Sequence, residues 1–207
     1  MSRGDGYEVE VLSWATTRSP DLNPTPLSPS MQRAAAFCAN AASDQSAVIG
    51  IAGPSGGEGA RTVTAMLAES LASDFQCDVL TLDTVSPVSG SAGKTPRTGA
   101  ASSAADGRVK HAYVPVPPAN ICGRWIAEIR EAAGISLITL PPVLANGAAL
   151  RLSRHLDGIM LVLDCENTRW QVAKAAQRVI GDAGGKCIGV ILNKRRRVIP
   201  EAIYRLL

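Results

Sequence analysis

Residues 48–71 constrain the fold of this chain more than any other stretch. An apolar run at 48–51 leads into four glycines within residues 53–59, and apolar residues then recur at helical spacing. This pattern predicts a strand, a glycine-rich loop and a helix. Glycine permits positive φ and close backbone approach, so such a loop can direct backbone N–H groups and a helix N-terminus at an anion. The sequence therefore predicts the geometry of a phosphate-binding loop.

The chemical signature of such a loop is incomplete here. A full signature ends in Gly-Lys followed by Ser or Thr, in which the lysine reaches the phosphates and the hydroxyl binds magnesium. In this chain Gly59 is followed by Ala60, Arg61 and Thr62. Two interpretations stay open at this stage. The loop binds a nucleotide with Arg61 and Thr62 displaced by one step, or it is a strand–turn–helix corner without a ligand.

Composition favours one α/β domain with an aliphatic core. The chain has 207 residues, of which 46% are hydrophobic and only 4% aromatic. Ala, Val, Ile and Leu must then build the core, which suits a parallel sheet covered by helices. A net charge of +3 is too small to indicate nucleic-acid binding, and we expect no nucleic-acid partner.

The cysteines and the apolar runs indicate a cytoplasmic chain. No secretory signal and no membrane-spanning apolar segment is visible. The five cysteines lie within or beside apolar runs without a Cys-x-x-Cys pair, and they predict buried free thiols in a reducing compartment; they are Cys38, Cys77, Cys122, Cys165 and Cys187.

Two segments are expected to lie outside the core. Residues 1–30 read as a Pro/Ser-rich tail or linker, and 31–207 as a single domain with a flexible loop at 86–108. Residues 7–12 form one short stretch of alternating polar and apolar side chains. The portion 7–14 could add a strand to a partner, or it could be ordered on its own domain or not at all.

Strands and helices are expected to alternate through the rest of the chain. This alternation predicts a doubly wound, mainly parallel sheet flanked by helices. One predicted helix has Ile121, Trp125, Ile126 and Ile129 on one face. The expected strands are 48–51, 77–82, 111–116, 135–140, 158–163 and 187–192, and the expected helices are 31–42, one carrying Val63, Met66, Leu67 and Leu71, then 121–133, 145–155, 168–180 and 200–207.

Polar residues follow two of these strands. Asp83 comes after the second, where a carboxylate could hold magnesium or orient water, or could simply initiate a turn. Asn193 ends the sixth strand, and four cations follow at 194–197. These cations could contact anionic lipid or nucleic acid, or form a solvated loop or partner-docking patch.

Four segments, in order, resemble a known family. GGEGARTVTAMLA resembles the PGEGKTTVAANLA segment of bacterial tyrosine kinases of polysaccharide synthesis (the CpsD, CapB and Wzc type), within the deviant Walker ATPases such as MinD and ParA. VLTLDT at 79–84 resembles their second Walker A segment, VLLIDAD. ITLPPVL and the apolar strand that follows it resemble VIIDTPPVL and ADGVLLVVR, and GVILN resembles GVVLN. The resemblance covers residues 45–207 and implies a P-loop NTPase-like fold.

The resemblance also shows where the chemistry departs from the family. Ala60 replaces the loop lysine, Arg61 the magnesium-binding hydroxyl, and Thr139 the Walker B aspartate, while Ser55 falls on the signature lysine. Asp83 remains as the one acidic metal residue. Without those groups the charge that develops in phosphoryl transfer has little to stabilise it.

The resemblance implies a catalytically degenerate regulatory or scaffold protein. Its expected partner is a membrane chain-length determinant or polysaccharide co-polymerase, in exopolysaccharide, capsule or adhesin biosynthesis or export, and its place is the cytoplasmic side of the inner membrane. Self-association into a homo-oligomer is open. The alternative is an active ATPase or tyrosine kinase that binds ATP or ADP with Mg through Arg61 and Asp83. The expected nucleotide contacts are Gly56, Gly57, Glu58, Gly59, Arg61, Thr62 and Asn193, with Asp83 as the magnesium ligand.

Overall fold

The computed structural model describes residues 11–15, 29–41, 46–85 and 108–195. Strands and helices alternate along these residues. The strands are β1 (Val11–Ala15), β2 (Ala47–Ala52), β3 (Val79–Val85), β4 (Val109–Pro115), β5 (Ile135–Thr139), β6 (Gly158–Asp164) and β7 (Cys187–Arg195). The helices are α1 (Pro29–Ala41), α2 (Ala60–Asp74), the 3-10 turn η1 (Ala119–Ile121), α3 (Cys122–Ala132), α4 (Gly147–Ser153) and α5 (Trp170–Asp182). Residues 86–107 of the loop expected at 86–108 and the whole helix expected at 200–207 lie outside the described residues.

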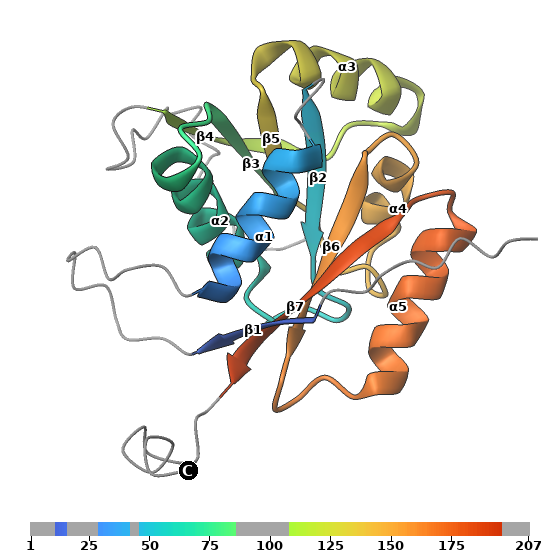
Figure 1. Ribbon diagram of the computed structural model, residues 1–207. Helices are drawn as coiled ribbons and strands as arrows, with labels where there is room; N and C mark the ends of the chain where they lie inside the picture. The colour runs from blue at the N-terminus through green and yellow to red at the C-terminus, as the bar shows by residue number, and fades with distance from the viewer. Residues whose placement is uncertain (1–10, 16–28, 42–45, 86–107, 196–207) are drawn as a thin grey trace, which may run out of the picture.

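The strands form one seven-stranded sheet in the order β1-β7-β6-β2-β5-β3-β4. Every neighbouring pair is parallel. Helices cover both faces of the sheet (Figure 1). The doubly wound parallel fold predicted from the sequence is confirmed.

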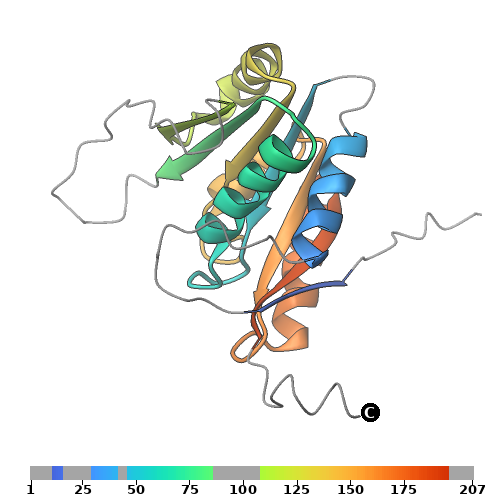
Figure 2. The same ribbon diagram turned by 60° about the vertical axis from the view of Figure 1, so that its left-hand side comes forward.

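The core consists of two apolar layers, one on each face of the sheet. On one face α1 and α2 pack side by side (Figure 2), and Met31, Leu67 and Leu71 meet Ile49 from the sheet. On the other face α3, α4 and α5 bring inward residues such as Ile126, Leu152 and Ile180. Because both faces are covered, β2 and β5 are buried along their whole length, and their sequences are mainly apolar rather than alternating.

The predicted starts of two elements, β3 and α3, are wrong. β3 begins at Val79 rather than at residue 77, because the Cys77 N–H donates to the Leu71 carbonyl at the end of α2 (3.1 Å). Asp83 therefore lies inside β3 instead of following it. Ile121 is 43% exposed, since it precedes α3 as its N-cap residue, whereas Ile126 and Ile129 are buried as expected.

The cysteines are less uniformly buried than their sequence context predicted. Cys38, Cys122 and Cys187 are buried, but Cys77 is half-buried and Cys165 is exposed. Cys38 lies in α1 against the sheet, and burial raises the pKa of its thiol to about 12. At neutral pH that side chain behaves as a small apolar group rather than as a nucleophile.

Part of the N-terminal segment belongs to the chain's own sheet. β1 pairs in parallel with β7, with Val11 opposite Val190 and Ser13 opposite Leu192. Residues 11–15 are therefore ordered on their own domain, which is one of the alternatives that the sequence leaves open.

Candidate functional site

The glycine loop leaves the carboxyl end of β2 and enters α2. Gly56, Gly57 and Gly59 have φ of 103°, 87° and 90°, which is the region that side chains disfavour. At Gly59 a Cβ atom would lie 2.4 Å from the Asn193 side-chain nitrogen. Positive φ thus favours glycine at all three positions. At Gly59 the close approach of the Asn193 side chain, from β7, requires glycine as well.

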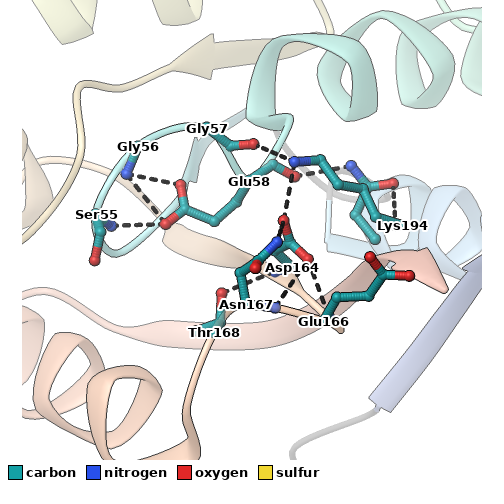
Figure 3. A network of polar contacts seen from close by, with 10 residues as sticks. Ser55, Gly56, Gly57, Glu58, Asp164, Glu166, Asn167, Thr168 and Lys194 are labelled. Atoms are coloured by element: carbon teal, nitrogen blue, oxygen red, sulfur yellow. Dashed lines mark hydrogen bonds and ion pairs between the residues drawn. The ribbon is translucent and has the colours of Figure 1, made fainter.

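The carboxylate of Glu58 folds back into this loop (Figure 3). It accepts hydrogen bonds from the backbone N–H of Ser55 at 2.8 Å and from that of Gly56 at 2.8 and 3.1 Å. Glu58 is only 5% exposed, and a Cβ on Gly53 would lie 2.2 Å from its Oε2. The chain's own carboxylate therefore engages two consecutive N–H groups of the loop.

Arg61 and Asp83 meet on the other side of the loop. The Arg61 guanidinium, in the first turn of α2, forms an ion pair with the Asp83 carboxylate in β3. The Asp83 side chain is 2% exposed and that of Arg61 68%. Neither carboxylate oxygen of Asp83 has a hydrogen-bond partner among the described residues, so the ion pair is what balances this buried charge.

Threonines surround Asp83 where a second carboxylate would complete a metal site. Thr139 lies opposite Asp83 in the sheet, and its hydroxyl donates to that of Thr64 (3.0 Å). Thr64 in turn donates to the Ala60 carbonyl (2.9 Å), and Thr84 donates to the carbonyl of Thr139 (2.5 Å). In the part of the chain that the structure describes, no group of three or more His, Cys, Asp or Glu side chains could hold a metal ion.

β7 holds the loop from a third side. Asn193 is buried; its side-chain N–H donates to the Glu58 carbonyl (2.8 Å), and its Oδ1 accepts from the Lys194 N–H (2.8 Å). The Lys194 ammonium donates to the Gly57 carbonyl (2.7 Å) and to Asp164 (2.9 Å). Lys194 also has φ of 56°, an unfavourable backbone for a non-glycine residue.

Asp164, the last residue of β6, fixes the position of the Lys194 side chain. Its carboxylate accepts from the Asn167 side chain, from Lys194 and from the backbone N–H of Glu166 and Asn167. The hydrogen bond from Asn167, followed by that from Lys194, holds the pKa of Asp164 well below its usual range. Asp164 is therefore ionised wherever the protein is folded near neutral pH, and the Lys194 ion pair persists.

An open pocket of about 360 Å³ lies between the loop and the turn after β6. Its lining includes Gly57, Glu58, Asp164, Thr168 and Lys194. Arg61, Asp83 and Thr62 do not line it; Thr62 is exposed on the first turn of α2. The predicted residues thus divide into one group at the loop and β7 (Gly56, Gly57, Glu58, Gly59 and Asn193) and another at α2 and β3 (Arg61 and Asp83).

The sequence pattern does not identify two residues of the site. It places Lys194 only within a basic run, and it assigns no role to Asp164. The partners of Lys194 are Gly57 and Asp164, which are 137 and 30 residues away in sequence. The local signal for Asp164 is the run Asp164-Cys165-Glu166-Asn167-Thr168, because an aspartate that accepts from N–H groups two and three residues later forms an Asx turn.

The fold and this loop define a P-loop NTPase-like α/β protein. No protein-family model and no curated protein matches the chain in sequence. Among solved structures, it is similar to the chimerical protein CapA2B2, with a TM-score of 0.70 and 18% identity over 92% of this chain and 96% of that one.

Two further structures share the architecture. The kinase domain of the Escherichia coli tyrosine kinase ETK aligns with a TM-score of 0.58 and 15% identity, over 75% of this chain and 71% of that one. A ParA family ATPase from Chlorobium tepidum aligns with a TM-score of 0.56 and 13% identity, over 79% and 80%. At these identities the likeness establishes the fold that this chain shares with them.

Proposed function

We propose that this chain is a catalytically degenerate, tyrosine-kinase-like protein that regulates or scaffolds a membrane polysaccharide co-polymerase. The process it serves is exopolysaccharide, capsule or adhesin biosynthesis or export. It acts at the cytoplasmic face of the inner membrane, held there by that partner. In the described residues, no helix is both long and apolar enough to cross a membrane.

The Arg61–Asp83 ion pair is the main observation that supports the proposed loss of catalysis. Phosphoryl transfer depends on a magnesium ion held by a loop hydroxyl and a carboxylate, and on a lysine at the β and γ phosphates. Here a guanidinium takes the position of the hydroxyl and engages the carboxylate that would hold the metal. Ala60 offers no charge, and Thr139 contributes a hydroxyl bonded to Thr64. The residues present do not fit a magnesium–nucleotide complex.

The role in polysaccharide assembly is supported by two likenesses that point the same way. The four sequence segments resemble bacterial tyrosine kinases of polysaccharide synthesis, and the fold is shared with the ETK kinase domain. A fold hosts many functions, so the test must address the activity and the partner directly.

The first test measures nucleotide binding and phosphotransfer on the purified full chain. Calorimetric titration with ATP and ADP, with and without magnesium, is expected to give no magnesium-dependent binding. Incubation with radiolabelled ATP is expected to leave the protein unlabelled. Phosphate labelling of the protein, on Tyr204 or on any other tyrosine of the sequence, would overturn the degenerate part of the proposal. Failure to co-purify with its co-polymerase in nanodiscs would overturn the scaffold part.

The exposure of Arg61 favours one second candidate, an active ATPase or tyrosine kinase. A side chain that is 68% exposed can leave Asp83 and turn its forked guanidinium toward phosphate oxygens. In that case Arg61→Ala abolishes ATP hydrolysis. Hydrolysis at the parent rate in Arg61→Ala would remove this candidate.

A further inference from the structure

The position of the Glu58 carboxylate is the feature that the proposed function leaves unexplained. Consecutive N–H groups in a glycine-rich turn form a concave anion site. In this chain an anion is already there, since the two Glu58 oxygens accept from Ser55 and Gly56 at 2.8–3.1 Å. A buried carboxylate requires such donors, and these N–H groups supply them.

The loop is also fixed around that carboxylate from the β7 side. The Asn193 side chain donates a hydrogen bond to the Glu58 carbonyl. The Lys194 ammonium donates one to the Gly57 carbonyl (Figure 3), so both peptide groups beside the Glu58 side chain are tethered. Lys194 in turn is paired with Asp164. The backbone that carries the Glu58 side chain is therefore held in place without any external ligand.

We propose that residues 53–59 form an anion site whose resident ligand is the Glu58 carboxylate of the same chain. Phosphate, whether inorganic or on a nucleotide, gains access to these N–H groups when that carboxylate is removed. This inference rests on the proposed function in one respect, since both describe a loop that serves no nucleotide in the native chain. It concerns the occupant of the loop, whereas the proposed function concerns chemistry at Asp83.

Competition between the two anions explains why the carboxylate prevails. Glu58 is tethered to the loop and pays no translational entropy on binding, whereas a free phosphate does. A phosphate entering beside the carboxylate would also bring like charges together in a partly desolvated site. The related segment PGEGKTT carries the same glutamate, with a lysine two residues later at the position of Ala60. Ala60 provides no such cation here, so nothing in the loop favours phosphate over Glu58.

The test compares the parent with Glu58→Ala, with Glu69→Gln as the control that removes an exposed carboxylate from α2. Inorganic phosphate and magnesium-free ATP are titrated while the amide NMR signals of Ser55 and Gly56 are followed. Glu58→Ala is expected to show saturable shifts at these amides and to bind phosphate at least about tenfold more tightly than the parent and the control. Circular dichroism and thermal melting verify folding.

A folded Glu58→Ala protein that gains no phosphate binding overturns the inference, as does a parent that binds phosphate equally tightly at these amides. If the alanine variant does not fold, Glu58→Gln serves instead. It keeps the size of the side chain but loses its charge, and it is expected to bind phosphate more tightly than the parent. These outcomes are separate from phosphotransfer, which tests the proposed function alone.

Discussion

Arg61 illustrates how one residue changes the character of a phosphate-binding loop. Its guanidinium neutralises Asp83, whose side chain is almost fully buried and lacks hydrogen-bond partners among the described residues. Removing one member of a buried pair leaves an uncompensated charge, which costs about 3–5 kcal/mol when both members are buried. Because Arg61 itself is largely in solvent, screening reduces this cost.

We expect Arg61→Ala to lower the free energy of unfolding by about 1–2 kcal/mol, measured by urea denaturation. The double variant Arg61→Ala, Asp83→Asn should regain most of the loss, because the stranded charge is gone. Arg124 forms an exposed pair with Glu128 one helical turn away, so Arg124→Ala is the matched control and should cost less than about 0.5 kcal/mol. Equal effects of Arg61→Ala and Arg124→Ala would contradict the account of Asp83.

At the same scale, the sequence identified the residue types of the site better than their contacts. The residue types at Ala60, Arg61 and Thr139 can be compared with the loop signature and the segment order in the sequence alone. The inward turn of Glu58 cannot be read from the sequence, because it depends on the positive φ of Gly56 and Gly57 and on two N–H groups that point to one spot. Periodicity describes which face a side chain occupies, and it carries no information on such a turn.

Among the elements, the junction between the glycine loop and α2 is the most tightly constrained. Gly59 is the N-cap residue of α2, with φ of 90°, and a Cβ there would collide with Asn193. Gly57 has a similar φ of 87° but nothing within 4 Å of an added Cβ. The two positions therefore separate backbone strain from steric collision.

We expect Gly57→Ala to cost about 1–2 kcal/mol of stability for positive φ alone. Gly59→Ala should cost at least about 1 kcal/mol more, because Asn193 must also move and release the Glu58 carbonyl. Thermal and urea denaturation of the two variants measure this difference. Gly134→Ala, at a position with open space and no unusual φ, is the control. A Gly59→Ala loss no larger than that of Gly57→Ala would show that Asn193 does not press on the loop.

The elements themselves were predictable where burial dominates. β2 and β5 are buried throughout because helices cover both faces, and the strands predicted at 48–51 and 135–140 lie within a residue of the observed bounds. The start of β3 was misplaced because Cys77 is recruited to the end of α2 by a backbone hydrogen bond. Ile121 was misplaced because a helical pattern does not reveal the residue at which a helix begins.

In the whole molecule, the fold is stabilised at places remote from the altered site. Near the amino ends of β2 and β6, Arg130 forms two hydrogen bonds to Asp157 (2.8 and 2.9 Å) and a third to the Ser46 carbonyl (2.6 Å). Asp157 also accepts from the Val48 N–H (2.7 Å). These contacts join α3, β2 and β6 without involving the loop, so the architecture does not depend on which residues stand at positions 60, 61 and 139.

This separation predicts that magnesium-dependent nucleotide binding can be restored to the intact fold. The triple variant combines Ala60→Lys, Arg61→Ser and Thr139→Asp. It returns the phosphate-binding cation and the metal hydroxyl, and it adds a carboxylate opposite Asp83 in the sheet. Without metal the two carboxylates repel each other and lack the Arg61 cation, so the variant should melt below the parent. With magnesium and ATP at about a hundred times Kd, binding should add about 2.7 kcal/mol. That raises Tm by several degrees, whereas the parent should not respond.

Differential scanning fluorimetry with ATP alone, magnesium alone and both together measures this response. The control replaces Thr139→Asp by Thr139→Asn in the same background, because asparagine matches the size of aspartate but binds magnesium poorly. The triple variant should respond only to magnesium and ATP together, and the control weakly. A folded triple variant with no response would mean that the fold has lost more than these three side chains. A response in the parent would mean that Arg61 and Glu58 yield to the nucleotide, which contradicts the proposed loss of function.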